Sequence, residues 1–224
     1  MKGTYRELAE LVLARKARLG AVRLVAVDGR AGSGKSTFAG RLAAELQRTR
    51  RVTVLHTDDF LDGWSKMPIW QPRLREWVFE PFRSGRAGAY RRYDWGLERL
   101  VDEWTVIEPP DVLIVEGVGS ASAVMRPDLT LSVLVHAPRG LRLRRGLERD
   151  GEALRPEWER WMTGEDGHFA EDGTPGAADV LVDGAPAEAH DPEIEYVIGP
   201  EGWTTGATLE DDPESRPDGE EQGE

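Results

Sequence analysis

The sequence predicts a three-layer α/β domain built on a five-stranded, mainly parallel sheet. Two observations support this prediction: short apolar runs rich in β-branched residues recur along the chain, and segments with helical spacing separate most of them. The predicted strands cover residues 22–27, 51–56, 111–117, 129–135 and 179–184. Runs that are apolar throughout are typical of strands buried on both faces, as in parallel sheets. A chain of 224 residues suits one such domain with a full-sized core.

Composition narrows the classes of function. The chain has no cysteine, which excludes a disulfide framework and a thiolate metal site, and its four histidines lack the spacing of a zinc site. The net charge is −12, of which −7 falls in residues 210–224. No basic face of the kind that binds nucleic acid is indicated, so we expect no nucleic-acid partner. No apolar run reaches the ~20 residues of a membrane span, and the N-terminus lacks a signal-peptide core, so we expect a cytoplasmic protein without membrane association.

The strongest motif is the run Gly29-Arg30-Ala31-Gly32-Ser33-Gly34-Lys35-Ser36, followed by Thr37, which fits the phosphate-binding pattern G-x-x-x-x-G-K-[ST]. A predicted strand precedes the run, and residues 35–47 follow it with helical spacing. Glycines let successive backbone N–H groups approach phosphate oxygens, and the helix directs its positive end at the same anion. Residues 29–37 are therefore expected to bind a nucleoside triphosphate, taken as ATP. Lys35 would reach the β- and γ-phosphates, and Ser36 would ligate Mg²⁺.

Three further helices are predicted from the spacing of apolar residues, at residues 4–19, 96–105 and 157–169. The first ends at a glycine and is expected to pack across the sheet, without a chemical role. The third is expected to pack back against an arginine-rich helix that precedes it.

Acidic residues follow two predicted strands at the edge of the sheet where the glycine run lies. Asp58 and Asp59 come after strand 51–56, and Glu116 ends the next strand. In open parallel sheets, ligands bind outside the carboxyl ends of the strands. Asp58 is therefore a candidate base for an attacking hydroxyl and, with Glu116 and Ser36, a candidate metal ligand, while Asp59 is a candidate acceptor ligand. The alternative is that one of the two aspartates is a turn or N-cap residue.

Residues 61–95 form a segment too long for a plain connection, and we predict that it is an acceptor-binding insertion. It interleaves aromatic residues with arginines, and is predicted to contain a short helix at 73–79 and an extended stretch at 90–95. Aromatic faces and guanidinium groups together could cradle a planar or sugar-like molecule. Tyr93 and Asp94 are the candidate acceptor ligands, because a carboxylate accepts hydrogen bonds from hydroxyls. The alternative is a small satellite core with solvated arginines. The aromatic residues concerned are Trp64, Trp70, Trp77, Phe79, Phe82, Tyr90 and Tyr93.

Residues 139–150 are rich in arginine, and Arg142, Arg145 and Arg149 share one helical face at i, i+3 and i+7. Beside a phosphate site, such a row indicates a lid, spanning about residues 139–171, that neutralises charge on a transferred phosphoryl group. Arg145 and Arg149 are predicted to be catalytic and Arg142 to bind substrate. The alternative is a solvated basic helix face.

With these motifs the chain resembles the branch of P-loop kinases that includes uridine kinase, phosphoribulokinase and the bacterial pantothenate kinases, and within it small actinobacterial uridine kinase-like proteins. The resemblance covers roughly residues 20–185 and rests on residues 28–37, 57–60 and 115–117, with Arg149-Asp150 ending the lid helix. It implies the P-loop NTPase fold, a catalytic-base and metal-neighbour role for Asp58, and a metal-site acid at Glu116. It also places Asp94 about where uridine kinases have an acid that binds ribose hydroxyls. The Trp- and Arg-rich insertion has no counterpart in those enzymes.

We therefore predict an ATP- and Mg²⁺-dependent kinase that phosphorylates a hydroxyl of a small-molecule acceptor, with a nucleoside such as uridine or cytidine as first choice. Two alternatives remain: a kinase of pantothenate, a sugar or a specialised metabolite, and a non-kinase regulatory ATPase. The kinase domain is expected to span residues 1–200, and residues 201–224 to form an acidic, disordered tail. The sequence does not set the choice between ATP and GTP or the oligomeric state.

Overall fold

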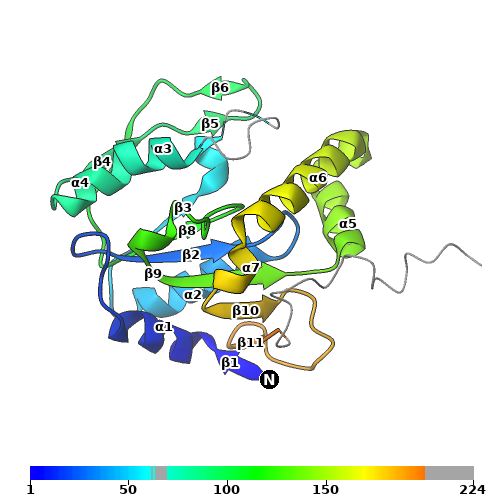
Figure 1. Cartoon of the computed structure of the whole chain (residues 1–224), viewed down its shortest axis with the longest axis horizontal. Coiled ribbons are helices and arrows are strands. Elements are labelled where there is room, and N and C mark those ends of the chain that lie inside the picture. The colour runs from blue at the N-terminus through cyan, green and yellow to red at the C-terminus, as the bar shows by residue number, and fades with distance from the viewer. Residues whose placement is uncertain (62, 64–69, 200–224) are drawn as a thin grey trace, which may run out of the picture.

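The computed structural model describes residues 1–61, 63 and 70–199. At its centre is a five-stranded sheet with the strand order β10-β9-β2-β8-β3, in which every neighbouring pair is parallel. Its strands are Arg23–Asp28 (β2), Val52–His56 (β3), Val112–Glu116 (β8), Leu129–His136 (β9) and Val180–Asp183 (β10). Each matches a segment that the sequence predicted, so the parallel α/β architecture is confirmed. Because β2 is central, its carboxyl end lies between those of β8 and β9 (Figure 1).

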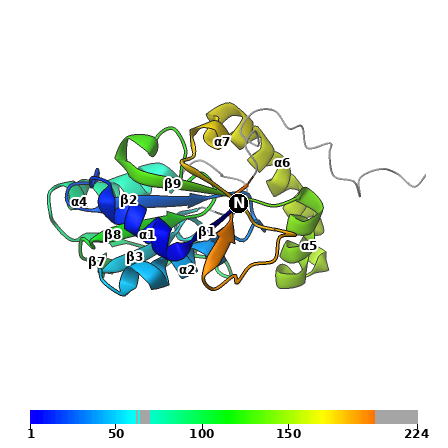
Figure 2. The same cartoon turned by 90° about the horizontal axis from the view of Figure 1, so that it is seen from below.

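One face of the sheet is covered by α1 (Tyr5–Ala14) and α2 (Lys35–Gln47), as Figures 1 and 2 show. Buried side chains of both helices pack against alternate residues of the strands. A short antiparallel pair, β1 (Lys2–Thr4) with β11 (Glu195–Val197), adjoins this layer. Its Tyr196 ring packs with those of Tyr5 and Phe38, at centroid distances of 5.6 and 5.3 Å.

Helix α1 is shorter than the predicted helix at 4–19. It starts with a capping box between Thr4 and Glu7 and ends at Ala14. Leu19 and Val22 then bridge to each other and are buried in the core on the opposite face of the sheet. The chain has to leave the helix early to bring these two side chains across the edge of the sheet.

The opposite face is covered by a helical segment at residues 70–83 and by α6 (Arg155–Asp172). The segment consists of α3 (Trp70–Leu74), a π-helical turn at Arg75–Phe79 and α4 (Glu80–Arg83), which confirms and extends the helix predicted at 73–79. Trp70, Phe79 and Phe82 are fully buried against the sheet. For these three residues the predicted acceptor cradle is wrong, because their side chains form the core. Trp64, part of the same prediction, lies outside the described residues.

The helix predicted at 96–105 is wrong. The chain instead forms two short antiparallel pairs, β4 (Gly88–Tyr90) with β7 (Thr105–Ile107) and β5 (Tyr93–Asp94) with β6 (Arg99–Leu100). Asp94 closes the β5–β6 turn by accepting hydrogen bonds from the backbone N–H groups of Gly96 and Leu97, both at 2.9 Å. The Gly96 and Leu97 N–H groups, at the start of the predicted helix, are thus held in a turn between two strands.

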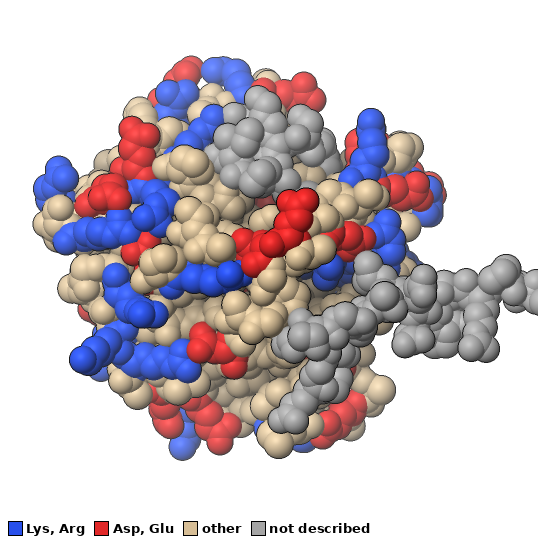
Figure 3. Space-filling model, in the orientation of Figure 1, with Lys and Arg blue, Asp and Glu red and all other residues tan. Residues whose placement is uncertain are grey.

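Asp128, just before β9, ties the helical segment at 70–83 to the sheet. Its carboxylate is 7 % exposed and accepts from the guanidinium groups of Arg75 and Arg83, at 2.8 and 2.5 Å. On the surface, Figure 3 shows acidic and basic side chains interspersed over the visible face of the molecule.

Helices α5 (Arg139–Asp150) and α6 form a hairpin beside the carboxyl ends of β2 and β9 (Figure 1), joined by a 3₁₀ turn at Glu152–Leu154. Gly146 of α5 lies flat against the indole of Trp158 in α6, so closely that a Cβ there would be 2.4 Å from the ring. The hairpin consists of the residues predicted to form a lid, about 139–171. After it, α7 (Thr174–Ala177) leads to β10. None of the helices among the described residues is both long and apolar enough to span a bilayer.

Candidate active site

The glycine run forms a tight loop between β2 and α2. Gly29, Gly32 and Gly34 have φ values of 150°, 79° and 99°. A Cβ on Gly29 would meet the Val135 carbonyl at 2.3 Å, whereas a Cβ on Gly34 would meet nothing within 4 Å. The loop is therefore packed at its start and open at its end. Lys35, Ser36 and Thr37 follow in the first turn of α2, where backbone N–H groups have no intrahelical partner.

Asp28 anchors this loop, a role that the sequence reasoning did not assign. The side chain is fully buried, with Oδ1 accepting from the N–H groups of Gly29 at 2.7 Å and Gly119 at 2.9 Å, and Oδ2 accepting from Ala121 at 2.8 Å. Burial raises the pKa of Asp28, although the three backbone hydrogen bonds oppose that rise. The available signal was an acid at the end of a strand, directly before the glycine run.

Glu116 and Ser36 come together beneath the open end of the loop. The Ser36 hydroxyl donates to Glu116 Oε1 at 3.0 Å. Burial favours a raised pKa for Glu116, but the hydrogen bonds from His56 and Ser36 and the charge of Lys35 outweigh it, so its pKa is lowered and it is a carboxylate at neutral pH. Glu116 Oε2 is buried and has no hydrogen-bond partner among the described residues.

His56 is a second residue that sequence reasoning missed. Strands β3 and β8 pair so that His56 lies opposite Glu116, and its Nδ1 is 2.5 Å from Glu116 Oε1. That hydrogen bond raises the pKa of His56. The strand register that brings the two together was not readable from the sequence.

These oxygen donors fit a magnesium ion. Ser36 Oγ and the unpartnered Glu116 Oε2 are hard oxygen ligands, which Mg²⁺ prefers. Within the part of the chain that the structure describes, no three His, Cys, Asp or Glu side chains form a ready cation cage. Such a sparse protein ligand set suits Mg²⁺, which usually keeps waters and binds substrate phosphates as well.

Asp58 and Asp59 lie in the 3₁₀ turn Thr57–Phe60 that follows β3. The protein atoms around Asp58 raise its pKa by desolvation; Lys35 and Arg149 oppose this effect, and Glu116 adds to it. The structure therefore brings Lys35, Asp58 and Glu116 within electrostatic reach of one another, as the predicted strand-end site requires. Desolvation also raises the pKa of Asp59, against the charges of His56 and Arg92.

Two residues of the glycine run do not face the open end of the loop. The Arg30 guanidinium pairs with Asp166 at 2.8 Å and lies 4.6 Å from the ring centre of Phe169. The Ala31 N–H donates to Glu165 at 2.6 Å. Both therefore contact α6. The Ala31 N–H is already engaged by Glu165, so a direct phosphate contact from that group is wrong in this geometry. The expected contact of the Arg30 backbone N–H with the nucleotide stays a prediction, because the pairing with Asp166 involves only the Arg30 side chain.

The predicted arginine row divides into three environments. Arg142 is 1 % exposed, pairs with Glu165 at 3.2 Å and donates to the Ala137 carbonyl at 3.1 Å, so its predicted contact with substrate is wrong. Burial lowers the pKa of Arg142 to about 10, which leaves it charged at neutral pH. Arg145 bridges the carbonyls of Gly32 and Gly184, both at 3.1 Å.

Arg149 is the member of the row whose charge acts on Asp58. A bidentate pair with Asp150 at 2.7 and 2.8 Å holds its guanidinium, which lies 5.7 Å from the ring centre of Trp158. Its positive charge lowers the pKa of Asp58, against the rise that desolvation causes. Of the three predicted lid arginines, Arg149 is the one placed to meet charge near Asp58.

The acceptor candidates Tyr93 and Asp94 lie in the β5 strand. The Asp94 Oδ1 atom serves the β5–β6 turn, and the Tyr93 hydroxyl lies 3.3 Å from the position of a Cβ on Gly63. Tyr90, which precedes them, stacks on Phe60 at 5.2 Å. Asp94 thus has a turn role, and a ligand could reach only its other oxygen without breaking that turn.

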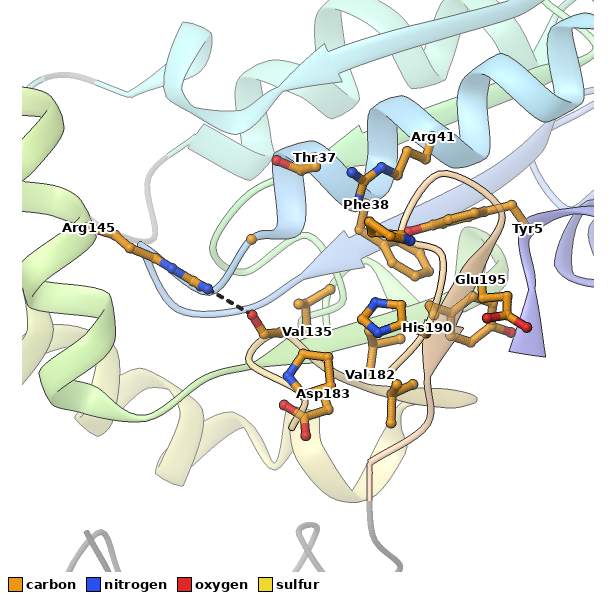
Figure 4. Close-up of a pocket in the computed structure, with 16 residues that line it drawn as sticks. Tyr5, Thr37, Phe38, Arg41, Val135, Arg145, Val182, Asp183, His190 and Glu195 are labelled. Carbon is orange, nitrogen blue, oxygen red and sulfur yellow. Dashed lines mark hydrogen bonds between the residues drawn. The ribbon is translucent and has the colours of Figure 1, made fainter. Parts of the chain in front are cut away.

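A cavity of about 430 Å³ opens beside the end of the glycine loop (Figure 4). Gly34, Thr37 and Phe38 form one wall, and the chain after β10 forms another. Arg145 lines one side of the cavity and donates to the Gly184 carbonyl, as the dashed line in Figure 4 shows.

No protein-family model matches the sequence, and no curated protein matches it. Solved structures do match. One is described as a possible uridine kinase from Bacillus stearothermophilus, with 20% identity and a TM-score of 0.59 over 79% of this chain and 96% of that one. Another is described as a candidate fructose transport system kinase from Silicibacter sp. TM1040, with 18% identity and a TM-score of 0.60 over 74% and 95% of the two chains. At these identities the likeness shows the fold: the chain has the P-loop NTPase fold of these kinase-like structures.

Proposed function

We propose that this chain is a kinase that transfers the γ-phosphoryl group of ATP to a hydroxyl of a small-molecule acceptor, a nucleoside such as uridine or cytidine being the first choice. The observation that best supports the proposal is the meeting of Lys35, Ser36, Asp58 and Glu116 at one edge of the sheet, next to open space at Gly34. Two structures of the same fold, described as a possible uridine kinase and a candidate fructose transport system kinase, support the class of reaction.

Each residue has a role in this proposal. Lys35 binds the β- and γ-phosphates, and Ser36 and Glu116 hold Mg²⁺, which when bound neutralises phosphate charge. Asp58 accepts the proton of the acceptor hydroxyl while that oxygen attacks the γ-phosphorus and the bond to the β-phosphate oxygen breaks, releasing ADP. A raised pKa makes Asp58 a better proton acceptor for this step. Arg149 stabilises charge on the transferred group.

The 430 Å³ cavity is the proposed place for the nucleotide base and sugar. It continues from the open end of the loop, where the phosphates would lie, and the Phe38 ring contributes an apolar surface. Competition between ATP and GTP for binding would show which base it takes.

The decisive test is ADP production measured with a panel of acceptors: uridine, cytidine, pantothenate and simple sugars. Turnover that depends on one acceptor supports the kinase. ADP release that no acceptor stimulates would favour a regulatory ATPase instead, and turnover with pantothenate or a sugar alone would favour the other kinase class.

Lys35→Ala should lower turnover by about 10²–10³-fold or more, because one preorganised cation on the phosphates is lost. Lys16→Ala, a change at an exposed lysine outside the glycine run, is the matched control and should keep full activity. Full activity in Lys35→Ala would exclude the proposed site.

A further inference from the structure

Glu165 of α6 joins the phosphate loop to both helices of the hairpin. It is completely buried. Its Oε1 accepts from the Ala31 N–H at 2.6 Å and from the Trp161 indole N–H at 2.8 Å, while Oε2 accepts from Arg142 at 3.2 Å. One carboxylate therefore contacts the loop, α5 and α6 at once.

The contact with Ala31 fixes a peptide group of the loop. On the other side of Ala31, its carbonyl accepts from Arg142 at 3.4 Å, and the next carbonyl, that of Gly32, accepts from Arg145 at 3.1 Å. Peptide groups are planar, so the backbone has two soft dihedral angles per residue. Holding successive peptide groups therefore restricts where the following amides, from Gly32 to Lys35, can point.

We propose that Glu165 is a positioning residue for the nucleotide. Acting through the Ala31 N–H, it keeps the loop in the arrangement that receives the phosphates, and it couples the α5–α6 hairpin to that arrangement. The inference rests on the proposed nucleotide site. It adds a residue that lies about 130 positions after the loop and itself contacts no phosphate in the proposal.

The competing explanation is that Glu165 only neutralises the buried Arg142. Two double variants separate the two roles, because the two oxygens of Glu165 have different partners. Arg142→Met with Glu165→Gln removes both charges but keeps an acceptor oxygen for Ala31. Arg142→Met with Glu165→Leu removes both charges and the acceptor. Replacing a buried ion pair by uncharged side chains is often neutral for stability, so both proteins are expected to fold, and thermal melting followed by circular dichroism checks this.

The readout is the Kd for ATP with Mg²⁺, measured by isothermal titration calorimetry, which needs no acceptor. The Leu double variant should bind about tenfold more weakly than the Gln double variant, because the Ala31 N–H is left without a partner. The single variant Glu165→Gln should bind within about threefold of the unchanged protein, since it too keeps that acceptor. Glu171→Gln, on the exposed surface of the same helix, is the control and should not change the Kd.

Equal Kd values for the two double variants would overturn the inference, because they would show that the acceptor oxygen does not matter. A tenfold loss in Glu165→Gln would also overturn it, because that variant keeps the acceptor and loses only the charge that pairs with Arg142. If the Leu double variant does not fold, the Glu165→Gln result decides alone. Absence of ATP binding by the unchanged protein would overturn the proposed function, and this inference with it.

Discussion

Asp28 holds two loops at the carboxyl edge of the sheet through three backbone N–H groups. In Asp28→Asn the amide oxygen can replace Oδ1, but the NH₂ group would then face the Ala121 N–H, donor against donor. A buried unsatisfied donor costs about 1–3 kcal/mol, so we expect the free energy of unfolding to fall by roughly that amount. Urea denaturation measures it. Asp102→Asn, whose side chain is 83 % exposed, is the control, and equal midpoints for both variants would contradict the anchoring role.

His136, at the end of β9, should make stability depend on pH. Burial, with the charges of Arg30 and Arg142, lowers its pKa to about 4, while Asp183 acts in the other direction. An unfolded histidine takes up a proton near pH 6.5, so stability is complete above that pH and is lost as the pH falls toward 4. The full loss, reached well below pH 4, is on the order of 3 kcal/mol, since one unit of pKa shift corresponds to 1.36 kcal/mol.

Unfolding of the unchanged protein and of His136→Asn across pH 4–7.5 tests this expectation. The difference in unfolding free energy between the two proteins should shrink or reverse toward acid pH, because the variant lacks the titrating group. A difference that stays constant over the range would show that His136 does not titrate differently in the folded state.

At the scale of elements, the α5–α6 hairpin depends on the absence of a side chain at Gly146. A Cβ there would lie 2.4–2.6 Å from three atoms of the Trp158 ring. Gly→Ala in a helix ordinarily stabilises by about 1 kcal/mol, but overpacking a buried contact costs about 1–3 kcal/mol, so the steric effect should win. Gly146→Ala is therefore expected to lower the melting temperature.

Gly167→Ala in α6 is the matched change, because a Cβ at that position meets nothing within 4 Å. It should leave the melting temperature unchanged or raise it. If both alanine variants melt alike, the close contact between Gly146 and Trp158 does not limit the hairpin.

The elements also show where spacing alone misleads. Leu97, Leu100, Val101 and Trp104 have helical spacing, yet the turn at Asp94 and the pairing of β4 with β7 set the backbone there. Arg142 and Arg149 share a helical face in the sequence, but Arg142 is buried and the Arg149 side chain is largely exposed. Which part of a helix face is covered depends on the neighbouring elements, and these come from distant parts of the chain.

For the whole molecule, the chain after Gly199 should be dispensable for stability. Gly199 is held by a hydrogen bond from its N–H to the Leu181 carbonyl at 3.0 Å. A protein that stops after Pro200 loses the acidic segment 210–224, with its net charge of −7. We expect it to keep the melting temperature of the full chain within about 2 °C, which for a domain of this size is no more than the shift of a 1 kcal/mol change. A larger drop would show that the tail contributes to the fold.

At this scale the sequence was most informative. The strands were predicted because each is an apolar run bounded by polar or glycine residues, and the glycine run and strand-end acids followed from them. The partnerships of Asp28, His56 and Glu165 could not be predicted, because each joins residues that are 60 to 134 positions apart. Such pairs depend on strand order and register, which periodicity does not encode.

The central position of β2 has a consequence for how the protein is made. The loop after β2 takes its shape from Gly119 and Ala121, which are 91 and 93 residues further along, and the neighbours of β2 in the sheet are β8 and β9. During synthesis, the glycine-rich segment leaves the ribosome long before the parts that shape it. A nascent chain that already carries every letter of the motif would thus have no affinity for nucleotide until most of the domain has followed.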